Sequence, residues 1–152
     1  MLTEITLTPI GTISTPFQQK FGIPRQPGLV PEAKGVITLD SKFDINCLRG
    51  LEEFSHIWIL FIFSETADKG WSPLVRPPRL GGNAKKGVFA TRSTHRPTPI
   101  GMSAVKLDSV IQKGHLNQIH VSGVDMMDNT PIIDIKPYVP YSDIVDAQSA
   151  GF

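Results

Sequence analysis

Short runs of β-branched and aromatic residues, separated by glycine and proline, are the feature of this sequence that most limits its fold. The 152 residues include 13 Gly and 13 Pro, more than the roughly 7% and 5% of an average protein. Such spacing favours short strands joined by turns over a few long helices. The runs predict strands at residues 2–13, 35–40, 56–63, 87–92, 102–111, 117–124 and 132–139.

Two of these segments carry more specific expectations. Residues 56–63 (HIWILFIF) are almost continuously apolar, which predicts a central strand covered on both faces. The segment 117–124 is expected to pair with 102–111 as a hairpin through Lys113 and Gly114. Between the strands, residues 45–54 predict one or two helical turns, with Leu48 and Leu51 facing inward.

These elements predict a mainly β fold in one domain. The strands suit an antiparallel barrel or sandwich, and we expect an antiparallel β-barrel of about seven strands with little helix. A Rossmann fold is excluded, because the sequence has neither a glycine-rich turn after its first strand nor crossover helices. The barrel is expected to span residues 1–140, followed by a loose C-terminal tail at 141–152.

The chain has a single cysteine, Cys47, so it cannot form an internal disulfide or a Cys-x-x-Cys pair. A reducing, cytoplasmic location is therefore expected. No apolar run approaches the roughly 18 residues of a membrane span, and no secretory signal precedes the first strand. We expect no membrane association.

The basic residues are concentrated in one part of the chain. Between Lys69 and Leu107 there are eight Lys and Arg and no Asp or Glu. If this segment folds onto one surface, its field would attract a polyanion. The alternative is that these are ordinary solvated side chains with acids from elsewhere beside them. The eight are Lys69, Arg76, Arg79, Lys85, Lys86, Arg92, Arg96 and Lys106.

Two proline-rich loops are candidates for binding. Residues 14–34 form a long loop in which prolines and glycines surround Arg25 and Gln26, and loops of this length are uncommon unless they bind something or are disordered. In the second loop, Pro97 and Pro99 hold Arg96 in a fixed place, where its guanidinium suits phosphate or carboxylate. The alternative for this second loop is a rigid solvent turn.

The turn at residues 125–131 places Asp125 and Asp128 three residues apart. They suit a cation, a ribose or an amine, or else Asp128 or Asn129 only caps the turn. A metal site is not expected, because no third oxygen ligand has suitable spacing. No P-loop, nucleophile elbow or His-Glu-x-x-His motif is present.

Five motifs, in order along the chain, resemble the TsaA-like (TrmO) family of tRNA methyltransferases. They are PRQP (24–27), FSHIW (54–58), RPPRLGGN (76–83), GVFATRSTHRPTPIG (87–101) and DMMDNTPIIDIKPY (125–138). The resemblance implies an S-adenosylmethionine-dependent enzyme built on a β-barrel and working as a homodimer. Its implied reaction methylates N6 of N6-threonylcarbamoyladenosine at position 37, beside the anticodon of threonine tRNAs.

The resemblance also assigns residues. The methyl donor is placed against Arg25, Gln26, Pro27, Ser64, Glu65, Arg92, Met102, Asp125, Met126, Met127 and Asp128. This chain departs from the family at Thr98, where Asn is usual, and at Asn129, where Gly is usual; Asn is the next-best residue for a left-handed turn. Many relatives continue with a C-terminal domain, which we expect this chain to lack, either as a short member of the family or as a fragment.

The chemistry predicts further roles. Asp125 or Asp128 is expected to bind the donor's ribose or amine, and Arg92 or Arg96 the threonyl carboxylate, so the catalytic candidates are Arg92, Arg96 and Asp128. The base is either a nearby side chain or the substrate's own carboxylate. Trp71 and His95 are candidates for stacking on bases. From charge alone, RNA phosphates are assigned to Arg76, Arg79, Lys85, Lys86 and Arg96.

Two other functions remain open. One is a non-enzymatic β-barrel module that binds RNA through the same basic surface. The other is a methyltransferase of the same fold that acts on a different substrate.

Overall fold

The computed structural model describes residues 2–18, 22–24, 26–77 and 84–150. The chain divides into two compact units. The first, here called the barrel unit, comprises residues 1–62 and 102–138, and the second, the loop unit, comprises 63–101 and 139–152. Of the predicted site residues, Arg25 and Arg79 lie outside the described residues.

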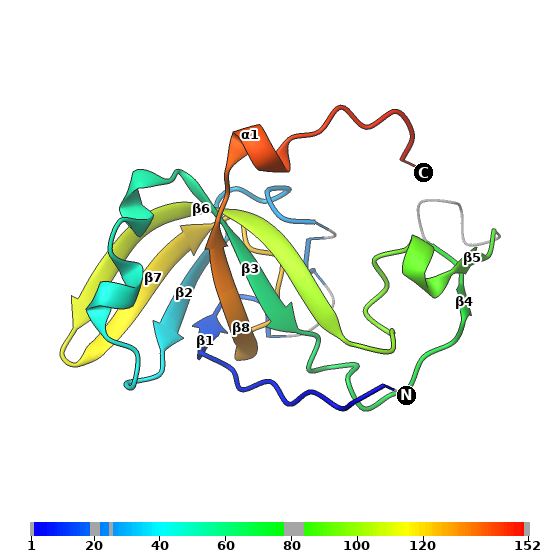
Figure 1. The fold of residues 1–152 in the computed structure, drawn as a ribbon, viewed down its shortest axis with the longest axis horizontal. Coiled ribbons are helices and arrows are strands. Elements are labelled where there is room, and N and C mark those ends of the chain that lie inside the picture. Colours follow the sequence, from blue (N-terminus) through cyan, green and yellow to red (C-terminus); the bar gives the residue numbers. More distant parts are fainter. Residues whose placement is uncertain (1, 19–21, 25, 78–83, 151–152) are drawn as a thin grey trace. The chain divides into compact units, whose positions relative to one another are not determined.

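Six strands of the described chain close into a barrel (Figure 1). The pairs β1–β2, β1–β8, β2–β7, β3–β8 and β6–β7 are antiparallel. The predicted antiparallel barrel is confirmed, and closure excludes the sandwich. The ring has six strands rather than about seven. In ring order they are β1 (Gly11–Ser14), β2 (Lys34–Leu39), β7 (Leu116–Ser122), β6 (Ile100–Lys113), β3 (His56–Ile62) and β8 (Thr130–Pro137).

Alternation along the strands fills the barrel with branched aliphatic side chains. In β3, Ile57, Ile59 and Phe61 are buried, whereas the residues between them are only half-buried. The prediction that this strand is covered on both faces is therefore only half right. Trp58, on its outer side, packs against Tyr138 with ring centroids 5.7 Å apart. The most deeply buried aliphatic residues include Ile13, Ile37, Ile57, Ile59, Ile119 and Ile132.

Other local predictions are confirmed. Two 3₁₀ turns, Ile45–Leu48 and Leu51–Glu53, form where helical turns were expected, with Leu48 buried and Leu51 half-buried. The β6–β7 hairpin turns at Gly114, whose φ of 65° lies in the left-handed region. The first strand is shorter than predicted, because it begins only at Gly11 and residues 2–9 form no regular element.

The loop unit contains a two-stranded sheet of β4 (Leu74–Val75) and β5 (Lys86–Gly87), and the single helical turn α1 (Pro140–Asp143). The strand predicted at 87–92 is wrong, since Val88–Ala90 is a 3₁₀ turn. The Thr91 hydroxyl donates to the Val88 carbonyl at 2.8 Å, so that carbonyl is not left for a strand partner. Within the described residues, no helix has the length and apolar character needed to cross a membrane.

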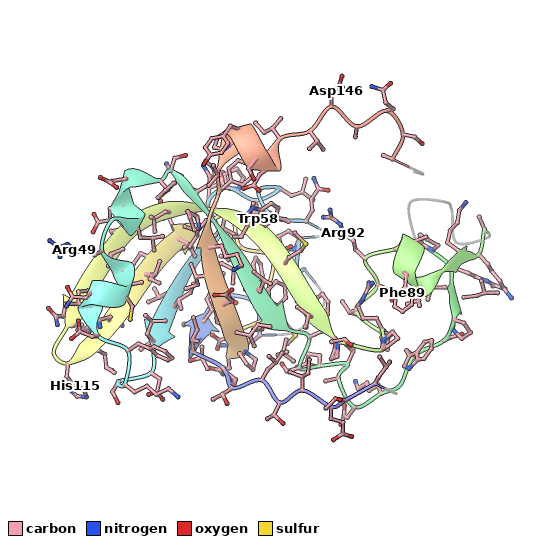
Figure 2. The ribbon with its side chains drawn as sticks, viewed as in Figure 1. Arg49, Trp58, Phe89, Arg92, His115 and Asp146 are labelled. Carbon is pink, nitrogen blue, oxygen red and sulfur yellow. The ribbon has the colours of Figure 1, made fainter. Side chains whose placement is uncertain are left out.

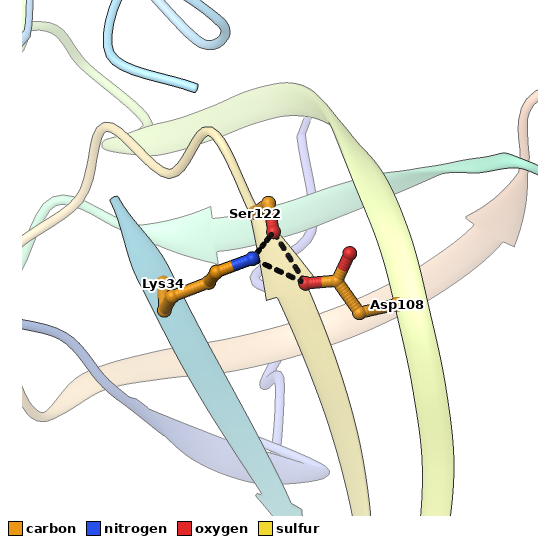
Figure 3. Close-up of polar contacts among 3 residues, drawn as sticks. All are labelled: Lys34, Asp108 and Ser122. Atoms are coloured by element: carbon orange, nitrogen blue, oxygen red, sulfur yellow. Dashed lines mark hydrogen bonds and ion pairs between the residues drawn. The ribbon is translucent and has the colours of Figure 1, made fainter. Parts of the chain in front are cut away.

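A polar cluster links three neighbouring strands on the outside of the barrel (Figure 3). The ammonium of Lys34 donates to the Ser122 hydroxyl at 2.8 Å, and Ser122 donates to the carboxylate of Asp108. The β6–β7 register shifts between Leu107 and Ser109, so Asp108 has no opposite residue in β7. This bulge places the carboxylate over Ser122.

The barrel interior leaves no room for a side chain at residue 35. A Cβ added to Gly35 would lie 2.9 Å from both Ile13 Cδ1 and Val124 Cγ1. We expect Gly35→Ala to lower the free energy of unfolding by about 1–3 kcal/mol, the usual cost of overpacking. Gly87→Ala is the control, since its Cβ would meet nothing within 4 Å. Urea denaturation measures both, and equal effects would contradict this description of the core.

Candidate functional site

Within the barrel unit, the first proline-rich loop lies against the segment that follows β7. Gly28 N–H donates to the Gly123 carbonyl at 2.9 Å, and Gly123 N–H donates to the Ala33 carbonyl at 2.8 Å. Both glycines have φ of 81°, and a Cβ on Gly123 would lie 3.3 Å from the Gly28 Cα. Only glycine combines this conformation with so close an approach. Gln26 and Pro27 are thereby brought near the start of the 125–128 turn.

The same turn is fixed to the end of β1. Thr15 N–H donates to Asp128 Oδ1 at 2.9 Å, and the Thr15 hydroxyl donates to the Met126 carbonyl at 2.9 Å. Asp128 N–H in turn donates to the Phe17 carbonyl at 2.7 Å. One carboxylate oxygen of Asp128 therefore has a structural role, although its partner is the distant Thr15 and not the backbone of its own turn, as the capping alternative had it. Asn129 adopts φ of 65°, which confirms that Asn serves where a left-handed residue is required.

Asp125 is the partly buried carboxylate of the turn. Its Oδ1 accepts a 2.7 Å hydrogen bond from the hydroxyl of Ser103. Burial raises the pKa of Asp125, because desolvation disfavours the ion, and the Ser103 hydrogen bond opposes this only in part. Ser103 itself is buried in β6, directly after the exposed Met102.

Sequence reasoning did not single out Ser103, although a signal was available. In β6, Ser103 shares its face with the buried residues Val105 and Leu107. A hydroxyl at an inward strand position requires a buried partner, and here the partner is Asp125. Of the other predicted residues, Met126 has its side chain in the core and Met127 is half-buried.

The barrel unit therefore gathers three segments that are distant in sequence. They are the loop at 26–28, the start of β6 at 102–103 and the turn at 123–128. The predicted donor residues Gln26, Pro27, Met102 and Asp125 to Asp128 all belong to these segments. The arrangement offers one carboxylate of raised pKa among apolar side chains and close-packed backbone.

The remaining predicted site residues belong to the loop unit. Ser64 and Glu65 are exposed on a turn that follows β3. This turn is joined to the second proline-rich loop, because the Thr66 hydroxyl donates to the Thr94 carbonyl at 2.8 Å and Phe63 N–H donates to the Pro99 carbonyl at 2.8 Å.

The two candidate arginines of the loop unit differ in what they contact. Arg96 Nη1 donates to the carbonyls of Thr91 and Ser93, at 2.9 and 3.1 Å. Its guanidinium therefore orders the loop that carries it. Arg92 is exposed (Figure 2). Arg76, Lys85 and Lys86, the other described members of the predicted RNA-binding set, are exposed as well.

Two hollows in the described barrel unit are lined by none of the predicted site residues. A hollow of about 270 Å³ lies beside the 3₁₀ turns and Val110, and one of about 250 Å³ is lined by Pro9, Gly11 and neighbouring β2 residues. Among the described side chains, no cluster of three or more His, Cys, Asp or Glu could hold a metal ion.

Comparison with known proteins identifies the family. The model of the tRNA-methyltransferase O N-terminal domain matches residues 12–144. The chain belongs to this family. The match contains both loops, the start of β6 and the 125–128 turn.

Relatives agree with this assignment. The tRNA (adenine(37)-N6)-methyltransferase of Escherichia coli K12 is 50% identical over 144 residues, which are 94% of this chain and 61% of that protein. A putative S-adenosylmethionine-dependent methyltransferase, RcsF, of Pseudomonas aeruginosa is 51% identical over 95% of this chain and 60% of its own length. The crystal structure of TrmO from Pseudomonas aeruginosa superposes with a TM-score of 0.80 at 42% identity, covering 99% of this chain and 63% of that one. The chain thus spans about three fifths of the length of these relatives.

The raised pKa of Asp125 makes stability depend on pH. Because its pKa is higher in the folded state, its stabilising contribution is present below the unfolded value of 3.8 and is lost as pH rises through the folded value. Asp125→Asn keeps an acceptor for Ser103 without the charge. We expect this variant to unfold at a higher temperature than the wild type at pH 7, with the difference shrinking as the pH approaches 4.

Thermal unfolding across this pH range checks the prediction. Asp146→Asn, at an exposed carboxylate of the C-terminal segment, is the control and should show no such trend. A difference between Asp125→Asn and wild type that stays constant with pH would contradict the role of burial.

Proposed function

We propose that this chain is an S-adenosylmethionine-dependent tRNA methyltransferase that methylates N6 of the adenosine at position 37. The proposal is carried by the family match over residues 12–144, together with the three segments that meet in the barrel unit. Its finer form takes N6-threonylcarbamoyladenosine of threonine tRNAs as the substrate. The homodimer and the cytoplasmic location belong to the same proposal; the homodimer rests on the resemblance to the family, and the location on the single cysteine.

The residues of the barrel unit suit S-adenosylmethionine. A carboxylate is needed for the ribose hydroxyls or the ammonium group, and Asp125 supplies one whose Ser103 partner fixes its orientation. Apolar surface is needed beside the methylene groups of the methionyl chain, and Pro27 and Met127 provide it while remaining partly accessible. Asp128 is the alternative carboxylate, and its Oδ1 accepts from Thr15 as that of Asp125 accepts from Ser103.

When bound, the sulfonium donor supplies a methyl group that is already activated for transfer. The protein's part is to align the acceptor nitrogen with that methyl group and to exclude water. In our proposal Asp125 holds the donor's ribose or amine, and Met102 and Pro27 border it. This agrees with the lack of a nucleophile motif in the sequence.

The acceptor nitrogen must be activated for methyl transfer, whereas the sulfonium donor is already activated. The N6 of a carbamoylated adenosine is a weak nucleophile, because its lone pair is delocalised into the carbonyl and the ring, so its proton must be removed. We assign binding of the threonyl carboxylate to the exposed Arg92. Arg96 is a positioning residue, because its Nη1 holds the carbonyls of Thr91 and Ser93 on either side of Arg92.

Calorimetry and a methyl-transfer assay test the proposal. We expect S-adenosylmethionine to bind the chain with micromolar affinity, and the methyl group to appear on tRNA that carries threonylcarbamoyladenosine. Unmodified tRNA should accept little or none. Donor binding with transfer to a different acceptor would indicate a methyltransferase of other specificity, and RNA binding without donor binding would indicate a non-enzymatic module.

The different contacts of the two arginines predict different phenotypes. Arg92→Ala should lower kcat/KM on the modified tRNA by about 10- to 100-fold, the loss expected for a hydrogen-bonded charge. It should leave hydrogen exchange of residues 91–99 unchanged. Arg96→Ala should both lower kcat/KM and speed exchange in this segment. Faster exchange in Arg92→Ala, or none in Arg96→Ala, would contradict the assignment.

A further inference from the structure

Phe89 is a large aromatic side chain that an ordered turn exposes to solvent. It is 79% exposed, on the 3₁₀ turn Val88–Ala90 of the loop unit. Its neighbour Val88 is only 3% exposed and donates its N–H to the Pro73 carbonyl at 2.9 Å. The Thr91 hydroxyl closes the turn on the Val88 carbonyl. The backbone beneath the ring is therefore fixed, although the ring itself is open to solvent.

Cationic side chains surround this turn along the chain and across the small sheet. In the antiparallel β4–β5 pair, Val75 lies opposite Lys86 and Leu74 lies opposite Gly87. Arg76 and Lys85 are the next residues of this register, directly beyond the end of the sheet. Arg92 follows the turn by two residues, and Figure 2 labels it together with Phe89. All four basic residues are exposed, and the sequence from Lys69 to Leu107 contains no acidic residue.

An exposed aromatic ring with basic residues beside it indicates which class of partner the loop unit binds. Lysine is depleted at the cores of protein–protein interfaces, whereas arginine and phenylalanine are enriched there, so Lys85 and Lys86 are the residues that disfavour a protein partner at this surface. Proteins that bind single-stranded nucleic acid instead combine a cationic groove with exposed aromatic rings on which bases stack. Trp71, 53% exposed on the segment that leads into β4, is a second aromatic ring of the same unit.

We propose that Phe89 is a stacking platform for an unpaired base of an RNA loop, with Arg76, Lys85 and Lys86 on the adjoining phosphates. The proposal rests on the proposed function in taking RNA as the substrate. It adds a residue that neither the motifs nor the charge pattern singled out. The ordered turn means that little entropy is lost when a base docks on the ring.

Binding of two RNA probes to the full chain tests this site without requiring catalysis. The probes are a stem–loop with an unpaired loop and a blunt duplex of equal length. Phe89→Ala and Phe89→Leu should weaken binding of the stem–loop by roughly 5-fold or more, as loss of one stacked base does. Both should leave duplex binding unchanged. Phe89→Tyr should retain wild-type affinity, because the flat ring remains.

Two further readouts separate stacking from charge. Phe89→Trp should show fluorescence quenching by the stem–loop beyond that of the wild type, which has Trp58 and Trp71. The dependence of stem–loop affinity on salt should keep its slope in Phe89→Ala, whereas Lys85→Ala and Lys86→Ala should each make it shallower by about one.

The outcomes distinguish this proposal from the function on which it rests. Wild-type stem–loop affinity in Phe89→Ala and Phe89→Leu would overturn the stacking platform, even if methyl transfer succeeds. A lower oligomeric state of Phe89→Ala in light scattering, with unchanged RNA affinity, would assign the ring to self-association and overturn it as well. Phe89-dependent stem–loop binding without any methyl transfer would leave the platform standing and contradict the proposed activity.

Discussion

The pairing of a four-residue strand on both of its sides is the constraint on which the barrel unit depends. β1 joins β2 on one side and β8 on the other, so Gly11–Ser14 is the segment that completes the ring. Immediately after it, Thr15 holds both Met126 and Asp128. The same few residues thus close the barrel and shape the turn that carries the candidate carboxylates. A candidate site attached to the closure of its scaffold can form only when the scaffold does.

The strand pattern was largely predictable because it follows from local alternation. β2, β3, β6, β7 and β8 all form where branched and aromatic residues are spaced for a strand, and Gly114 marks the hairpin turn. The prediction at 87–92 failed because the hydroxyl of Thr91 satisfies the Val88 carbonyl locally. Residues 2–9 have strand-like composition, but Gly11 already lies opposite Leu39, the last residue of β2, so an earlier start of β1 would find no further β2 residue to pair with.

The candidate site was predictable in its segments but not in its contacts. The residues themselves indicated the first loop and the 125–131 turn, and the hydrogen bonds around Gly28 and Gly123 bring these segments together. Asp125 and Asp128 have different hydrogen-bond partners, and these partners are distant residues that no local pattern identifies. Thr15 gives Asp128 a structural partner, and Ser103 orients Asp125. Likewise, the carbonyls that bind Arg96 distinguish it from Arg92.

The distance along the chain between the bonded partners has a kinetic consequence. Thr15 and Asp128 are 113 positions apart, and β1 must meet β8 after almost the whole sequence has been ordered between them. Folding rates fall as such non-local contacts come to dominate a topology. The strand edges of the folding chain stay open until β1 meets β8, and by this reasoning the chain is more prone to aggregate in that interval than as the finished barrel.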